Sequence, residues 1–168
     1  MTSSAAVARI SRGGFLVRSV RESDTAAIHR HISAIYADYG DVLDVEREDT
    51  HLREPGSFFR SDGGEFWVVL DGDELIATGA IFLMQDLAEI RTIYVRTDRR
   101  RLGLARALTQ MGIDHAVHRG YRVIHLWSDK RYTEAHRLYE SMGFVRIGER
   151  EVRITNAYSE WRYRLTLN

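Results

Sequence analysis

Residues 88–108 read AEIRTIYVRTDRRRLGLARAL and join a β-type run, a cluster of arginines and a helical pattern. The run Ala88–Val95 is rich in β-branched and aromatic residues, which is typical of a strand. Three consecutive arginines follow at 99–101, and from Leu104 onward apolar residues recur at the spacing of one helix face. The stretch therefore predicts a strand that runs through a basic turn into a long helix.

Small residues, Gly103 and Ala105, open this predicted helix. Backbone N–H groups at a helix start have no partner inside the helix, and the helix dipole places positive charge there. A pyrophosphate fits such a site, with Arg99, Arg100, Arg101 and Arg106 adding charge. The motif is neither a Walker P-loop nor a GxGxxG dinucleotide fingerprint. The same residues are also consistent with arginines that form a solvated face over an ordinary turn.

The remaining elements follow from the same patterns of spacing and turn residues. We expect strands at 15–20, 66–70, 75–84, 123–127 and 161–167, and helices at 28–39, within 41–60, at 104–120 and at 135–142. Gly143 suits the left-handed position after the last helix, with Phe144 packing back. The order βα(α)ββ–βα–βα–ββ predicts an α/β (α+β) fold in which helices cover one sheet. We expect residues 1–14 to form a flexible arm and residues 15–168 a single domain.

Composition excludes several classes of protein. The 168 residues are 44% apolar and 29% charged, which excludes a disordered chain, a collagen and a long coiled coil. The chain has no cysteine, which excludes disulfides and thiol nucleophiles, and no histidine pair has metal-ligand spacing. Twenty-four basic residues balance twenty-four acidic ones, which argues against nucleic acid or membrane as a partner. No apolar run is long enough to span a membrane, so we expect a cytoplasmic protein without a metal.

Two motifs resemble the GCN5-related N-acetyltransferase (GNAT) superfamily. Arg100-x-x-Gly103-x-Ala105 resembles the acetyl-CoA signature Q/R-x-x-G-x-G/A of that family, and it follows a hydrophobic strand as the signature does. Residues 135–144, AHRLYESMGF, resemble the helix ending A..LYE..GF, and residues 17–24 resemble the opening strand and turn. The resemblance spans about residues 15–165. It departs from the family at Tyr132, where many members carry asparagine.

The resemblance implies a GNAT-type mixed, mostly antiparallel sheet of six to seven strands, flanked by about four helices. Its central parallel strands splay apart, here around Ile93 and Trp127, and the pantetheine arm of acetyl-CoA pairs between them. A backbone N–H near Tyr94 or Val95 then faces the thioester oxygen. The cofactor-binding residues implied in this way are Ile93, Tyr94, Val95, Arg100, Arg101, Leu102, Gly103, Leu104, Ala105 and Arg106.

Two catalytic residues are predicted. Tyr139 occupies the tyrosine position of the resembling helix, and a phenol with an ordinary pKa of about 10 can protonate a departing thiolate. On spacing alone, Tyr139 would be a core aromatic, because it falls on the stripe with Ala135, Leu138 and Met142. Glu89 lies fourteen residues before Gly103, the spacing at which histone-type members carry a catalytic glutamate, so it is the predicted base. The alternatives are a solvated charge at position 89 and water as the base.

The sequence thus predicts an N-acetyltransferase that moves an acetyl group from acetyl-CoA to a primary amine by direct attack. A non-catalytic acyl-CoA sensor stays an alternative, as does a nucleic-acid-binding domain that uses the arginine cluster. The acceptor is expected to be a small-molecule or peptide amine, and the protein a monomer or homodimer. The acidic segment 36–49 would suit a cationic amine, or it is an ordinary solvated loop.

Overall fold

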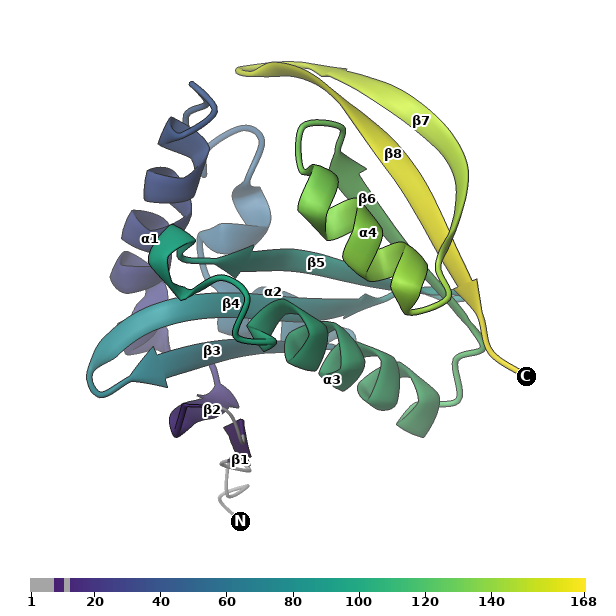
Figure 1. The fold of residues 1–168 in the computed structure, drawn as a ribbon, viewed down its shortest axis with the longest axis horizontal. Helices are drawn as coiled ribbons and strands as arrows, with labels where there is room; N and C mark the ends of the chain where they lie inside the picture. The colour runs from purple at the N-terminus through teal and green to yellow at the C-terminus, as the bar shows by residue number, and fades with distance from the viewer. Residues whose placement is uncertain (1–7, 11–12) are drawn as a thin grey trace.

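The computed structural model describes residues 8–10 and 13–168, in which eight strands form one sheet (Figure 1). The strand order is β1-β2-β3-β4-β5-β6-β8-β7, and only β5 and β6 run parallel. The strands are β1 Ala8–Ile10, β2 Phe15–Ser19, β3 Glu65–Asp71, β4 Glu74–Leu83, β5 Ala88–Val95, β6 Val123–Asp129, β7 Val145–Arg153 and β8 Ala157–Thr166. The helices are α1 Thr25–Ala37, α2 Pro55–Ser61, α3 Leu104–His118 and α4 Thr133–Ser141, with short 3₁₀ turns at Glu22–Asp24, Thr50–Leu52 and Thr97–Arg99.

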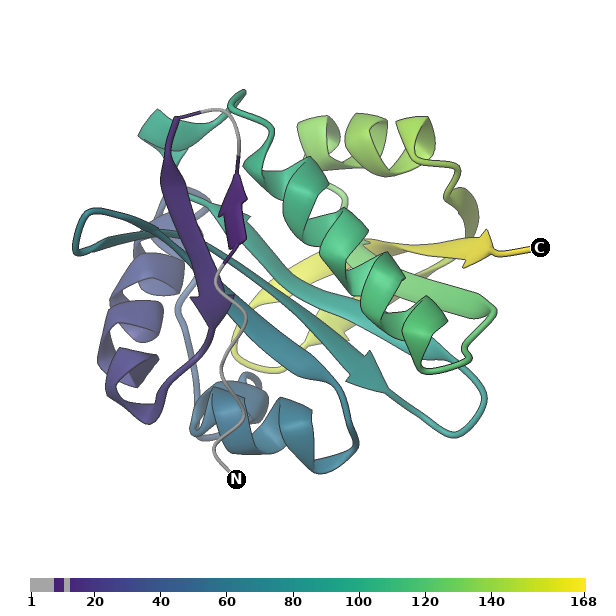
Figure 2. The same ribbon diagram turned by 90° about the horizontal axis from the view of Figure 1, so that it is seen from below.

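Helices cover both faces of this sheet (Figure 2). α1 and α2 pack on one face against β3 and β4, and α3 packs on the other face against β4 and β5, with α4 beside it. Each layer buries its own apolar cluster, one centred on Phe59 and Phe66 and the other on Leu108 and Tyr163. The predicted mixed, mostly antiparallel sheet with splayed parallel strands is confirmed.

Strands β2 to β8 are the seven that the sequence order predicted, and β1 is an eighth, short strand. It pairs with β2 from within the segment expected to be a flexible arm. The rest of that arm, residues 1–7 and 11–12, lies outside the described residues, whereas residues 13 and 14 form a turn. Asp24, the residue before α1, makes no side-chain cap of the helix, because its carboxylate accepts hydrogen bonds from Arg18 at 2.7 and 2.9 Å.

The parallel strands β5 and β6 separate after three paired residues. Their last pair is Ile90 and Leu126. Two residues later, Thr92 has a φ of 53°, and the β4–β5 register shifts opposite it. A bulge of this kind bends its strand, and here it is held by the Thr78 hydroxyl, which donates to the Thr92 carbonyl at 2.8 Å. The bulge opens the sheet beside the basic turn.

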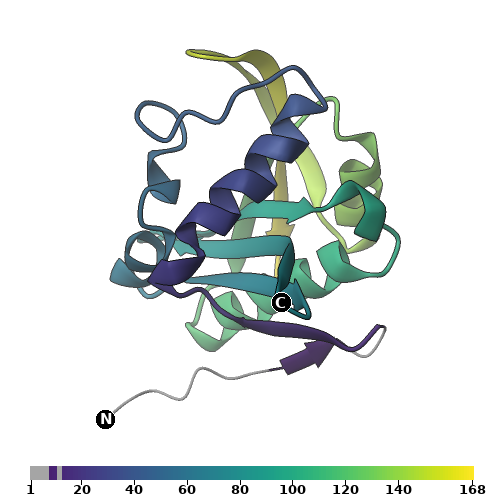
Figure 3. The same cartoon turned by 90° about the vertical axis from the view of Figure 1, so that its left-hand side faces the viewer.

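The loop after α1, residues 41–49, crosses this opening and reaches the turn between β7 and β8. The Asn156 side chain donates to the Val42 carbonyl at 2.9 Å and accepts from the Val42 N–H at 3.0 Å. Glu48 accepts from the backbone N–H of Thr155, so the loop is attached at two points. Figure 3 shows the loop and the hairpin tip side by side at the top of the molecule. We call residues 41–49 the strap.

Candidate active site

A groove of about 670 Å³ runs between the basic turn and α4. We call it the basic groove, because it is lined by arginines from three places: the basic turn, the start of α3, and α4 with the residues before it. Of the ten residues predicted to bind the cofactor, nine line this groove, and Leu102 instead packs against the core. Tyr139 of α4 also lines the groove, as does Tyr132, which directly precedes that helix.

The start of α3 leaves backbone N–H groups available to a ligand in this groove. Gly103 is the residue before the helix, with a φ of 79°, and it has no side chain to cap the following amides. The first amide that bonds back to this turn is that of Ala107, so those of residues 104–106 have no helical partner. No atom lies within 4 Å of where a Gly103 Cβ would stand. Among the described residues, Arg100 has no ion pair, so both amides and charge are free for an anion.

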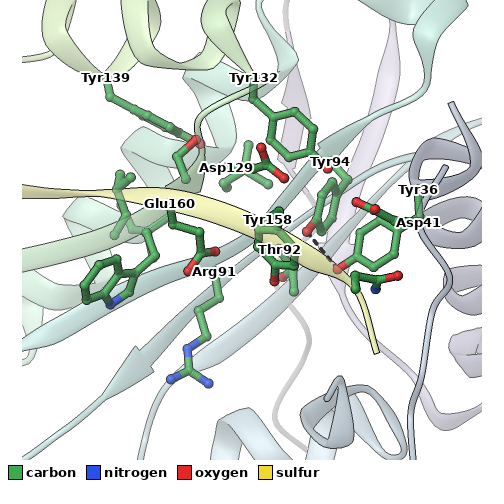
Figure 4. Close-up of a pocket in the computed structure, with 16 residues that line it drawn as sticks. Tyr36, Asp41, Arg91, Thr92, Tyr94, Asp129, Tyr132, Tyr139, Tyr158 and Glu160 are labelled. Carbon is green, nitrogen blue, oxygen red and sulfur yellow. Dashed lines mark hydrogen bonds between the residues drawn. The ribbon is translucent and has the colours of Figure 1, made fainter. Parts of the chain in front are cut away.

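A small pocket of about 70 Å³ lies where β5 and β6 diverge (Figure 4). We call it the central pocket. It is lined by residues 90–94 of β5, by Leu126 to Asp129 of β6, and by Tyr139, Tyr158 and Glu160. Thr92 contributes a buried hydroxyl that has no hydrogen-bond partner among the described residues. The splay has therefore produced a polar pocket next to the groove.

Tyr139 stands between the basic groove and the central pocket and lines both. Its ring is 6% exposed and packs against Phe144 and Tyr163, with centroids 5.9 and 6.1 Å away. Figure 4 shows its hydroxyl directed into the central pocket. Burial raises the pKa of the phenol, so it keeps its proton. The two sequence alternatives for Tyr139 are thus compatible, because the ring belongs to the core and the hydroxyl reaches the pocket.

A third cavity of about 520 Å³ adjoins the central pocket on the side away from Tyr139. We call it the outer pocket. Thr92, Tyr158 and Glu160 line both of these cavities, whereas Glu89 lines only the outer one. The Glu89 carboxylate is bonded to Arg91 Nε at 2.5 Å. The predicted base therefore lies near the site, but not in the pocket that Tyr139 reaches.

Glu160 is a carboxylate that the sequence analysis did not select. It is 9% exposed, and one of its oxygens accepts from Arg150 Nε at 2.6 Å. Burial raises the pKa of the Glu160 carboxyl, although Arg150 opposes the shift. A buried carboxylate with a raised pKa in a cleft is a typical arrangement of a general base.

The family model described as Acetyltransferase (GNAT) family matches residues 22–144, which include the basic groove and Tyr139. The chain belongs to the GNAT acetyltransferase family. It is 29% identical to an N-acetyltransferase of Escherichia coli, YjgM, described as uncharacterized, over 79% of this chain and 83% of that protein. The predicted membership is confirmed.

Solved structures of acetyltransferases share this fold. An acetyltransferase of Streptococcus agalactiae superposes with a TM-score of 0.79 at 16% identity, covering 92% of this chain and 99% of that one. A putative acetyltransferase of Salmonella typhimurium, yncA, whose structure holds acetyl-CoA, gives a TM-score of 0.72 at 19% identity over 92% and 94%. At these identities the comparisons support the fold of the chain.

Tyr132 stands where many GNAT members carry asparagine. Its ring packs edge-on against Tyr39 at 4.8 Å, and it lines both the basic groove and the central pocket. Burial raises the pKa of Tyr132, so the side chain offers a neutral hydroxyl there. Position 132 therefore keeps an uncharged polar group, with the larger side chain of tyrosine in place of asparagine.

The acidic segment that seemed suited to a cationic amine is not a free anionic surface. Asp41 binds Arg131 at 2.5 Å, and Asp44 accepts from the Thr155 hydroxyl at 2.8 Å. Asp49 accepts from the Tyr36 hydroxyl and from the Asp44 N–H, at 3.2 and 3.0 Å. These carboxylates fasten the strap to the rest of the molecule, and the sequence alone gave no sign of their partners.

Two other kinds of site were sought in residues 8–10 and 13–168. No group of three or more histidine and acidic side chains there is arranged to hold a metal ion. No helix there is long and apolar enough to cross a membrane. His136 is buried, and its Nε2 hydrogen-bonds the Asp129 carbonyl at 2.9 Å.

Proposed function

We propose that this GNAT chain is an N-acetyltransferase that uses acetyl-CoA to acetylate the primary amine of an acceptor by direct attack. The observation that carries the proposal is that Tyr139 lines the basic groove on one side and the central pocket on the other. A module that only bound acyl-CoA would need no second polar pocket joined to the first at a proton donor. This arrangement favours an enzyme over a sensor.

The groove offers the contacts that acetyl-CoA requires. Its pyrophosphate suits the uncapped amides of residues 104–106 and the guanidinium of Arg100. Beyond Ile90, β5 has lost β6 as a partner, so its edge can bond an amide-containing arm as an added strand. We expect the pantetheine arm along Ile93 to Val95, with a backbone N–H of that segment facing the thioester oxygen. Acetyl-CoA then supplies the acetyl group in activated form.

Tyr139 is the proposed general acid. As the carbon–sulfur bond of the thioester breaks and the carbon–nitrogen bond forms, the departing sulfur takes the Tyr139 proton. The raised pKa of the phenol keeps it protonated before this step. Burial also disfavours a thiolate in the same surroundings. The pKa of the phenol and the pKa of the departing thiol are therefore both raised.

The proton of the attacking amine has two candidate acceptors besides water. Glu160 lines the central pocket, and its raised pKa makes it a stronger base than an exposed glutamate. Glu89, the residue predicted from its spacing, lines only the outer pocket. Both carboxylates are bonded to an arginine, so their positions decide between them, and we propose Glu160 as the base.

The proposal is tested by the release of coenzyme A thiol from acetyl-CoA across a panel of primary amines, with calorimetric titration of coenzyme A alongside. We expect micromolar binding of coenzyme A and thiol release that depends on an added amine. Binding without turnover on any amine would favour the acyl-CoA sensor. Tighter, salt-dependent binding of DNA than of coenzyme A would favour the nucleic-acid alternative.

A further inference from the structure

We propose that the acceptor is a small molecule that carries a carboxylate close to its amine, as an amino acid does. Arg91 and Arg150 bind the carboxylate in the outer pocket, and the amine enters the central pocket. The inference rests on the proposed acetyl transfer and names the substrate class of the same site. Its evidence is the state of the charged groups that line the two pockets.

Arg91 and Arg150 reach the outer pocket from β5 and β7 and are held in the same way. Each donates from Nε to a glutamate, Arg91 to Glu89 at 2.5 Å and Arg150 to Glu160 at 2.6 Å. Each also lies over an aromatic ring, Arg91 over Phe82 at 4.7 Å and Arg150 over Trp127 at 4.0 Å. The guanidinium groups are therefore oriented before a ligand arrives.

The terminal nitrogens of both guanidinium groups have no hydrogen-bond partner among the described residues. A guanidinium presents these two nitrogens as a fork that matches a carboxylate. The other two arginines of the pocket, Arg47 and Arg153, have side chains that are 75% exposed. Among the arginines that line this pocket, only Arg91 and Arg150 thus combine an ion pair with stacking on an aromatic ring.

The carboxylates that line the outer pocket are already bonded to other groups, so they do not occupy the terminal nitrogens of Arg91 and Arg150. Glu48 accepts from the backbone of the β7–β8 turn, and Asp49 from Tyr36 and Asp44. Glu89, Glu151 and Glu160 each pair with an arginine. Burial, with Arg91 nearby, lowers the pKa of His51 to about 4, so this ring is neutral.

The opposite end of the acceptor meets groups that suit an amine. Thr92 and Glu160 line both the central and the outer pocket. The Thr92 hydroxyl is buried without a partner, and Thr92 holds a strained φ of 53°. Strain and an unpaired polar atom at one residue indicate a group kept for a ligand. In Figure 4, Glu160 lies between Tyr139 and Arg91, as an amine-to-carboxylate order requires.

The strap limits the size of the acceptor. It is fastened to the β7–β8 turn through Asn156 and Glu48, over the opening between β5 and β6. The central pocket below it measures about 70 Å³, and the outer pocket about 520 Å³. An amino acid fits within this space with its amine in the central pocket and its carboxylate in the outer pocket.

The experiment measures thiol release with matched acceptors: the L-amino acids, their carboxamides and their decarboxylated amines. We expect kcat/KM to be at least about 10²-fold higher for the best amino acid than for its carboxamide or amine, because those analogues leave the arginine fork unpaired. The carboxamide is the sharper control, since it keeps the shape of the amino acid and replaces the carboxylate with an uncharged group.

Variants of the outer pocket test whether its arginines cause the preference for an amino acid over its carboxamide. The charge-balanced pair Glu89→Gln with Arg91→Met should raise KM for the amino acid about 10-fold or more and reduce its advantage over the carboxamide, with coenzyme A affinity unchanged. Arg91→Lys should keep part of the advantage, since lysine keeps the charge without the fork. Arg47→Met changes an arginine that lines the same pocket but is not proposed to bind the carboxylate. This variant should keep the full advantage of the amino acid over its carboxamide.

The outcomes separate this inference from the proposed function. If coenzyme A binds and amines are acetylated without a preference for a carboxylate, the inference fails and the acetyltransferase proposal stands. An unchanged preference in the charge-balanced pair, shown to be folded by its melting temperature, also overturns the inference. If neither coenzyme A binding nor thiol release is found, the proposed function itself fails.

Discussion

The backbone N–H of Phe144 donates to the carbonyl of Tyr139 at 3.0 Å, and the two rings meet edge-on at 5.9 Å. This bond and the one from Gly143 to Glu140, at 3.1 Å, form the Schellman ending of α4. Gly143 supplies the left-handed φ of 93° that the ending requires. The helix ending therefore fixes Tyr139 at the junction of groove and pocket, which is where a proton donor must be held.

The substitution Tyr139→Phe should lower kcat about 10²-fold or more, since a positioned proton donor contributes on that scale. The affinity for coenzyme A should change little, because the ring and its contacts with Phe144 and Tyr163 remain. Steady-state kinetics and calorimetry check the two quantities. A variant with full kcat would leave Tyr139 as a core aromatic only.

The substitution Gly103→Glu should abolish coenzyme A binding, because it puts a carboxylate beside the amides proposed for the pyrophosphate. Gly120→Glu at the other end of α3 is a matched control. Both glycines have a positive φ, 79° and 86°, and neither has an atom within 4 Å of a built Cβ. The two variants should therefore lose similar stability, of about 1–2 kcal/mol. Equal coenzyme A affinity in both would contradict the proposed cofactor site.

The substitution Asn156→Ala should raise KM for the acceptor and lower the melting temperature. It removes both side-chain bonds to Val42 and so detaches the strap from the β7–β8 turn at one of its two points. Coenzyme A affinity should stay the same, because Asn156 does not line the basic groove. An acceptor KM equal to that of the parent would show that the strap does not shape the acceptor site.

Local sequence signals were enough for the parts of the site that are contiguous in the chain. The strand at 88–95, the start of α3 and the glycine ending of α4 each depend on residues a few positions apart, and the structure has all three. The groove follows from these elements because a strand, a basic turn and a helix start must be neighbours in space. That is why nine of the ten predicted residues line it.

The acceptor side depends on contacts that no local pattern carries. Glu160 lies just before the last strand that the sequence predicts. In the structure β8 begins earlier, at Ala157, because its first residues pair with β7, where Ala157 lies opposite Arg153. Thr92 is an ordinary strand residue by composition, and its strained φ arises from the register shift against β4. The positions of Arg91 and Arg150 across one pocket likewise come from strands far apart in the sequence.

The two candidate bases differ in what their loss does to the pH profile of kcat/KM. If Glu160 takes the amine proton, kcat/KM rises with pH as Glu160 becomes ionised in the free enzyme. Since burial raises the pKa of Glu160, this limb should lie above the ordinary glutamate value of about 4.3. Glu160→Gln should remove the limb and lower kcat about 10²-fold or more, leaving only the ionisation of the amine itself. Glu89→Gln should keep the limb, because Glu89 lies outside the central pocket. Loss of the limb in Glu89→Gln alone would assign the base to Glu89, and an unchanged limb and kcat in both variants would show that neither glutamate is the base.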